Sequence, residues 1–148
     1  MCRWRGEPSK NLPAKDSMET ILLVEDSKFL RIATERALSK SGYMVICAVD
    51  GEEALLLAGK HVPDLVLLDM LLPKLSGPEV LKALKANGLT AKIPVMVLSS
   101  LSQKNEEKLV ADGAAAFLEK GPLLENPSLL LNAIKRVLTK KVLAAGKS

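Results

Sequence analysis

The stretch D-L-V-L-L-D-M-L-L-P, from Asp64 to Pro73, indicates the fold class of this chain. Its four aliphatic residues, Leu65 to Leu68, lead without a polar break to one carboxylate, Asp69. An apolar run of this length is typical of a strand buried on both faces, as in a parallel sheet that has helices on both sides. An ionised carboxylate in such a place is costly unless it is compensated, so Asp69 is a candidate functional residue.

Similar apolar runs alternate with helical patterns from Glu19 onward. In the first helical pattern, Leu30, Ala33, Ala37 and Leu38 recur at helical spacing. Strands that alternate with helices of this size form right-handed βαβ units, which place helices on both faces of a parallel sheet. We expect strands at 21–24, 44–49, 65–68, 95–98 and, as a weaker pattern, 114–118, with helices at 28–40, 52–60, 77–87, 103–112 and 127–143.

The composition fits one globular domain of 148 residues, with 48% hydrophobic and only 3% aromatic residues. No apolar stretch approaches the roughly 20 residues of a membrane span, and no secretory signal is present, so we expect a soluble protein. The cysteines, Cys2 and Cys47, show neither C-x-x-C spacing nor a disulfide framework, which favours the cytoplasm. The net charge of +4 is scattered over several helices and the tails, so nucleic-acid binding is not expected.

The domain is expected to span residues 19–143, with tails on both sides. Residues 1–18 have mixed charge and little periodicity, which predicts a disordered tail, and Met18 is a candidate natural start. Residues 144–148 form a short C-terminal tail. We therefore expect a stand-alone domain with no output domain attached.

Three carboxylates are expected to meet at one edge of the sheet. Glu25 and Asp26 directly follow the first apolar run, and Asp69 ends the third. Ligands of open α/β sheets bind beyond the carboxyl ends of the strands, where the strand order reverses. Three ionised carboxylates in one cleft repel each other unless a cation compensates, and hard oxygen ligands suit Mg²⁺.

The fourth and fifth apolar runs add a hydroxyl and an ammonium group to the same edge. Ser99 follows V-M-V-L, and Lys120 follows A-A-A-F-L-E, so both supply donors for an anionic phosphoryl group. Each element has a simpler explanation alone. Asp26 or Ser27, and likewise Ser99 or Ser100, are candidate helix caps, and a lysine is usually solvated. The complete set, however, favours a phosphoryl-transfer site.

Four motifs of the sequence resemble the receiver domain of bacterial two-component response regulators, similar to the single-domain chemotaxis type. The motifs are I-L-L-V-E-D-S at 21–27, D-L-V-L-L-D-M-L-L-P-K-L-S-G at 64–77, I-P-V-M-V-L-S-S at 93–100 and D-G-A-A-A-F-L-E-K at 112–120. The resemblance extends from about Glu19 to Leu143. It implies a flavodoxin-like (βα)5 three-layer sandwich with a parallel five-stranded sheet of order 2-1-3-4-5.

The resemblance also implies a role for each matching residue. Asp69 would accept a phosphoryl group from a histidine kinase or a histidine phosphotransfer protein. Mg²⁺, or alternatively Mn²⁺, would be held by Asp26, Asp69, the main-chain carbonyl of Leu71 and, through water, Glu25. The phosphoryl group would be bound by Ser99, Ser100 and Lys120.

A switch is implied as well. In this family the hydroxyl at Ser99 is coupled to an aromatic residue at Phe117, which changes the face of the fourth helix, fifth strand and fifth helix. Phe117 is equally compatible with a plain core role. In receivers, the positions of Leu71 and Leu101, two places beyond Asp69 and Ser99, govern water access to the acyl phosphate. Both residues are apolar here, so the resemblance implies slow autodephosphorylation.

Departures and alternatives remain. The family usually has proline directly after its lysine, whereas Gly121 intervenes here, an insertion expected to move the loop that carries Lys120 and to alter the approach of the last helix. An enzyme of the haloacid-dehalogenase type also uses a strand-end Asp and Mg²⁺, but its second Asp is replaced by Leu71. A pseudo-receiver that binds partners without phosphorylation is the third alternative. The output partner is unknown, and a monomer or weak dimer is expected.

Overall fold

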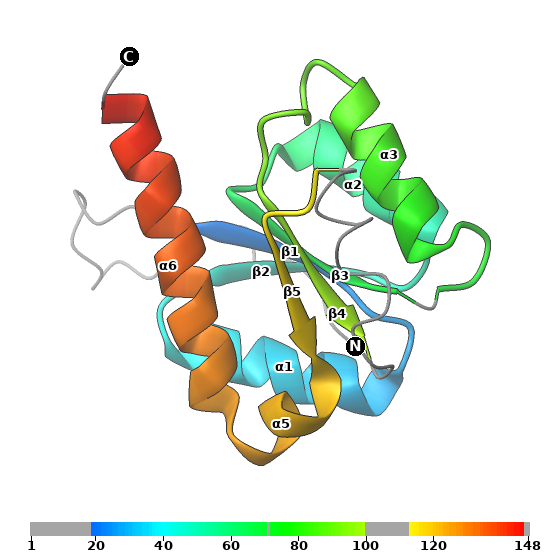
Figure 1. The fold of residues 1–148 in the computed structure, drawn as a ribbon. Coiled ribbons are helices and arrows are strands. Elements are labelled where there is room, and N and C mark those ends of the chain that lie inside the picture. The colour runs from blue at the N-terminus through cyan, green and yellow to red at the C-terminus, as the bar shows by residue number, and fades with distance from the viewer. Residues whose placement is uncertain (1–18, 71, 100–112, 147–148) are drawn as a thin grey trace.

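The sheet has five parallel strands in the order β2-β1-β3-β4-β5, which confirms the expected fold class. The computed structural model describes residues 19–70, 72–99 and 113–146. Figure 1 shows the twisted sheet at the centre of the molecule. The strands are β1 (Thr20–Val24), β2 (Met44–Ala48), β3 (Leu65–Asp69), β4 (Val95–Ser99) and β5 (Ala116–Glu119).

Helices cover both faces of the sheet (Figure 1). On one face lie α1 (Lys28–Lys40), α5 (Lys120–Glu125) and α6 (Pro127–Gly146), and on the other α2 (Gly51–His61) and α3 (Gly77–Ala86). Each face has its own apolar core, because successive side chains of a strand point to opposite sides. Every described residue of β3 is buried, as the opening motif predicts for the middle strand of a covered sheet.

Local signals start the helices at the carboxyl edge of the sheet. The hydroxyl of Ser27 caps α1, and the carboxylate of Asp50 caps α2. At α3, Ser76 and Glu79 form a reciprocal capping box. These three helices therefore begin beside the ends of β1, β2 and β3.

The C-terminal region differs from the expectation in one element. The predicted helix at 127–143 is α6, but a short additional helix, α5, precedes it. Pro122 is the third residue of α5, in the first turn, where a missing N–H removes no helical hydrogen bond. Asn126 then separates α5 from α6. The helix expected at 103–112 lies outside the described residues.

The inner face of α1 also differs from the expected one. Leu38 is buried, but the other buried residue of the helix is Arg31, and Ala33 is exposed. The apolar residues Leu30, Ala33 and Ala37 line a pocket against α5 and α6 instead of the core. The side chain that points inward near the start of α1 is that of Arg31, because its guanidinium donates to the main-chain carbonyls of Glu25 and Asp26 just after β1.

Two observations concern the environment of the chain. None of the described helices has both the length and the apolar character that a bilayer span requires. Cys47 on β2 is disulfide-bonded, contrary to the expectation drawn from cysteine spacing.

Candidate phosphoryl and metal site

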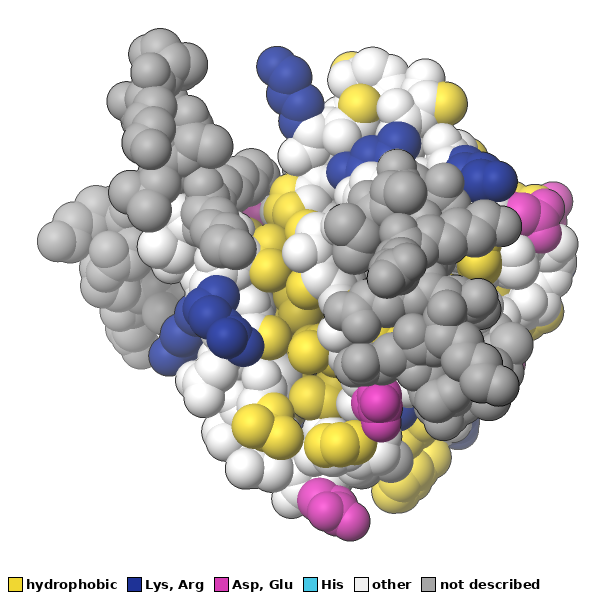
Figure 2. Space-filling view, in the orientation of Figure 1, with side chains coloured by type: hydrophobic (Ala, Val, Ile, Leu, Met, Phe, Trp, Pro, Cys, Tyr) yellow, Lys and Arg dark blue, Asp and Glu magenta, His cyan; other side chains and the backbone are white. Residues whose placement is uncertain are grey.

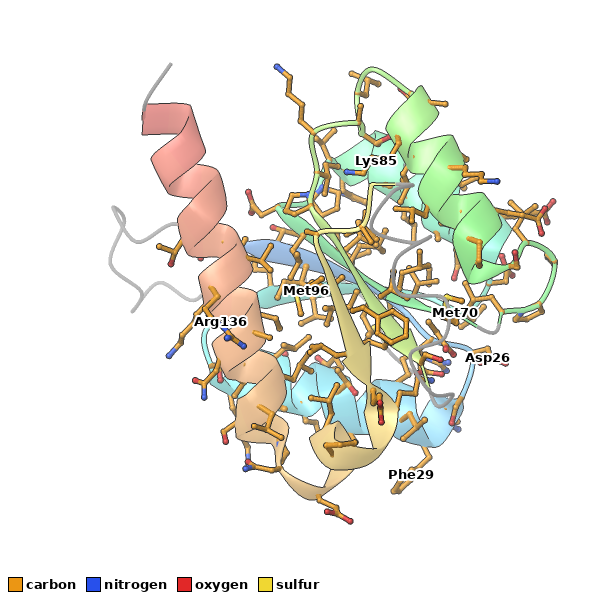
Figure 3. All side chains as sticks on the ribbon, viewed as in Figure 1. Asp26, Phe29, Met70, Lys85, Met96 and Arg136 are labelled. Carbon is orange, nitrogen blue, oxygen red and sulfur yellow. The ribbon has the colours of Figure 1, made fainter. Side chains whose placement is uncertain are left out.

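Three carboxylates converge at the carboxyl edge of the sheet, as the sequence predicts. Glu25 and Asp26 follow β1, and Asp69 ends the neighbouring β3. Their ligand oxygens all lie within 4.8 Å of one another. Glu25 and Asp69 are each 4% exposed, whereas Asp26 faces solvent at the same edge (Figure 3). Such a set of hard oxygen donors, open on one side, has the chemistry of a Mg²⁺ site.

Lys120 joins two of these carboxylates. Its Nζ lies 2.8 Å from Oε1 of Glu25 and 3.0 Å from Oδ2 of Asp69. The lysine side chain is only 14% exposed, so this ammonium group is largely shielded from water. The contacts of Lys120 show that Gly121, which follows it, does not move the lysine away from the site. Lys120 is the first residue of α5.

The electrostatics of the pair follow from burial and proximity. Burial raises the pKa of Glu25, and the charge of Asp69 raises it further, although the hydrogen bond from Lys120 opposes both effects. Burial alone would lower the pKa of Lys120, but its hydrogen bonds and attraction to Glu25 and Asp69 outweigh this and raise it. Lys120 thus stays protonated. Its single positive charge does not balance the three carboxylates of the cluster.

The backbone on each side of the site is fixed by local contacts. The N–H of Glu25 donates to the carbonyl of Ala48 on β2 at 3.0 Å, and the N–H of Ser27 donates to Oε2 of Glu25 at 3.2 Å. After β3, the N–H of Gly77 donates to the carbonyl of Met70 at 3.0 Å. The start of α3 is thereby held against the residue that follows Asp69.

Ser99 and Phe117 lie on the last two strands. Ser99 ends β4 and is 3% exposed, one residue beyond Leu98, which pairs with Asp69 across the sheet. Phe117 pairs with Val97 and is 8% exposed, with its side chain in the core on the α2 and α3 face. The other predicted site residues, Leu71, Ser100 and Leu101, lie outside the described residues.

Two charged residues with contacts at this edge of the sheet were not predicted. Arg31 donates from one guanidinium nitrogen to the carbonyls of Glu25 and Asp26. Lys74, with a φ of 69°, lies 3.5 Å from carboxylate oxygens of both Asp50 and Glu52 and so links the β3–α3 loop to the start of α2. A charged residue on a helix or in a loop is ordinarily solvated, and no sequence pattern separates these two from the rest.

The fold and the site define a doubly wound α/β domain whose strand order reverses at an acidic edge with one lysine. The chain belongs to the response regulator receiver domain family, whose model matches residues 21–135, and it is a receiver of two-component signalling.

Relatives from several bacteria support this assignment. A gliding motility regulatory protein of Myxococcus xanthus is 39% identical over 137 residues, which cover 91% of this chain but only 17% of that protein. The polar-differentiation response regulator DivK of Brucella anthropi is 36% identical over 69% of this chain and 84% of that protein. The response regulator MprA of Mycolicibacterium vanbaalenii is 37% identical, and the chain spans about half of its length (51%).

The fold has solved counterparts. The chemotaxis response regulator CheY4 of Vibrio cholerae superposes with a TM-score of 0.76 at 32% identity, over 82% of this chain and 99% of that one. A putative response regulator from Chloroflexus aurantiacus gives a TM-score of 0.76 at 29% identity, with similar coverage. These structures share the overall fold described above.

Proposed function

We propose that this receiver accepts a phosphoryl group on Asp69 in a Mg²⁺-dependent reaction, from the phosphohistidine of a kinase or phosphotransfer protein. The observation that carries the proposal is the contact of 3.0 Å between the buried carboxylate of Asp69 and Nζ of Lys120, beside two further carboxylates. A nucleophile, a cation-binding set and a fixed ammonium group are thus within reach of one phosphoryl group.

The donor set fits Mg²⁺. Asp26 and Asp69 would ligate the ion, with the carbonyl of Leu71 as a third protein ligand and Glu25 acting through water; Mn²⁺ is the alternative ion. The bound ion would neutralise the charge that develops on the phosphoryl oxygens. Because one side of the cluster faces solvent at Asp26, the ion would keep waters that phosphoryl oxygens can replace.

The chemistry is an in-line displacement. A carboxylate oxygen of Asp69 attacks phosphorus, the P–N bond to the donor imidazole breaks, and the nitrogen keeps the electron pair. Lys120 would move its contact from Asp69 to a phosphoryl oxygen, and the hydroxyls of Ser99 and Ser100 would donate to the others. The protein supplies mainly position and charge, so a small phosphodonor also serves.

The response is a change in a partner-binding face. We infer that Ser99 turns toward the phosphoryl group and that Phe117 repacks, which alters the face of the fourth helix, β5 and α6. Figure 2 supports this location, because hydrophobic side chains form a band over the edge strand β5. Ala116 and Leu118 of that strand are only half-buried. The output partner would bind this face.

The lifetime of the phosphoryl group is expected to be long. Leu71 and Leu101, beside Asp69 and Ser99 in the sequence, offer no polar group to orient an attacking water. We propose slow autodephosphorylation, action in the cytoplasm, and a monomer or weak dimer. Decay of the adduct within seconds after removal of the donor would contradict the first of these.

Intact mass spectrometry tests the proposal. Incubation with acetyl phosphate or a phosphoramidate and Mg²⁺ should give one phosphoryl adduct, and both Asp69→Asn and chelation of the metal should abolish it. Asp50→Asn is the matched control, because Asp50 also follows a strand but lies outside the acidic cluster, and its adduct should remain. A wild-type chain that stays unmodified with several donors would favour the phosphorylation-independent binding module, and sustained phosphate release would favour the phosphotransferase.

A further inference from the structure

Arg31 is the one buried cation of the described chain that has no part in the proposed phosphoryl transfer. It lies in the second turn of α1 and is only 8% exposed. Its NH1 nitrogen donates to the carbonyl of Glu25 at 3.0 Å and to the carbonyl of Asp26 at 3.3 Å. A buried guanidinium needs such partners, and both of these belong to the loop that carries two of the three clustered carboxylates.

The side chain of Asp26 depends on this backbone for its position. Within residues 19–70, 72–99 and 113–146, its carboxylate makes no hydrogen bond or ion pair, in contrast to Glu25, which contacts Lys120 and Ser27. Among the described contacts, those of the main chain at residues 25 and 26 are the ones that limit where the Asp26 carboxylate can lie. Arg31 is the described side chain that holds both carbonyls of that segment.

We propose that Arg31 is a positioning residue for divalent-cation binding, which it supports by holding the main chain under Glu25 and Asp26. The proposal rests on the proposed Mg²⁺ site and adds a residue to it that touches neither ion nor phosphoryl group. Partners that orient metal ligands in this way commonly change metal affinity by 10- to 100-fold when they are removed.

Charge and position predict opposite effects, which makes the proposal testable. Arg31 is a cation near a cation site, so electrostatics alone predicts tighter Mg²⁺ binding after its removal. Loss of positioning predicts weaker binding. A purely structural arginine would lower the melting temperature and leave the dissociation constant unchanged when it is measured well below melting.

The experiment measures Mg²⁺ dissociation constants by isothermal titration calorimetry in full-length wild type, Arg31→Met and Arg31→Lys. Arg36→Met is the matched control, because Arg36 lies on the same helix, is exposed, and carries the same charge. We expect Arg31→Met to bind Mg²⁺ about tenfold more weakly, Arg31→Lys to lie between it and wild type, and Arg36→Met to match wild type.

Each outcome decides a different question. The proposal is overturned if the Arg31→Met variant binds Mg²⁺ as tightly as the Arg36→Met variant, or more tightly. If Arg31→Met does not fold, Arg31→Lys decides, because lysine keeps the charge but its shorter side chain ends before the position of NH1, which donates to both carbonyls; an unchanged dissociation constant then overturns the proposal. A wild-type chain that binds no Mg²⁺ rejects the proposed function itself, together with this inference.

Discussion

Gly77→Ala tests whether the start of α3 must lie directly against the backbone of β3, the strand that ends at the proposed phosphoacceptor Asp69. A β-carbon at Gly77 would stand 2.7 Å from the carbonyl oxygen of Asp69 and 2.7 Å from Cα of Met70, whereas ordinary contacts begin at 3.4 Å. Both neighbours are main-chain atoms, so no side-chain rotation relieves the clash. We expect the free energy of unfolding to fall by about 2 kcal/mol, as for other overpacked sites.

The clash also reaches the site. Because the N–H of Gly77 donates to the carbonyl of Met70, α3 cannot move away without moving the residue after Asp69. We expect phosphorylation by acetyl phosphate at saturating Mg²⁺ to slow about tenfold, since small displacements of a nucleophile are costly.

Gly59→Ala is the control for this prediction. Gly59 lies within α2, and a β-carbon there meets nothing within 4 Å. Alanine should therefore stabilise the chain by up to about 1 kcal/mol and leave phosphorylation unchanged. Urea unfolding with a common slope measures both stabilities. The reasoning is refuted if the Gly77→Ala variant has the same free energy of unfolding and the same phosphorylation rate as wild type.

Three further predictions concern single charges and one strained residue. Lys120→Met removes the cation between two buried carboxylates and should slow phosphorylation about 100-fold; a rate close to wild type in a stopped-flow assay contradicts this role. The hydrogen bond from the Glu53 N–H, together with Lys74, holds the pKa of Asp50 below its ordinary value of 3.8, so its ionised form stabilises the fold above that value. Wild type should be more stable than Asp50→Asn near neutral pH, and urea unfolding should show the difference vanish as pH falls through the lowered pKa. Val62, with φ 43° and ψ 67° at the end of α2, should tolerate glycine with a gain of about 1 kcal/mol in thermal unfolding experiments, and a loss of stability counts against strain there.

The sheet was largely predictable from the sequence. Strands buried on both faces appear as continuous apolar runs, and right-handed crossovers leave few ways to assemble them. The resemblance then supplied the strand order that the structure confirms. The short helix α5 was missed because the K-G-P sequence suggests a break, although a proline in a first turn is compatible with a helix.

The convergence of Glu25, Asp26, Asp69 and Lys120 was predictable for a related reason. Parallel strands all deliver their carboxyl ends to one edge, so residues that follow the apolar runs must meet there. Arg31 was not predictable, because its partners are main-chain carbonyls, which every residue has. Sequence periodicity shows on which face of a helix an arginine lies. It does not show whether the guanidinium donates to a buried carbonyl or to water.

The charge balance of the site links its resting state to its proposed response. Three carboxylates and one ammonium group leave a formal charge of −2 at a largely buried edge, which a divalent cation would cancel. Phosphorylation of Asp69 would replace one negative charge with a phosphoryl group that carries about two. The phosphorylated cluster would then again carry excess negative charge, and the phosphoryl oxygens would need further hydrogen-bond donors. Ser99, already buried at the end of the adjacent strand, would supply a donor, and its movement would reach Phe117 through the paired strands β4 and β5. The switch would thus follow from the same charge deficit that favours a cation at this edge.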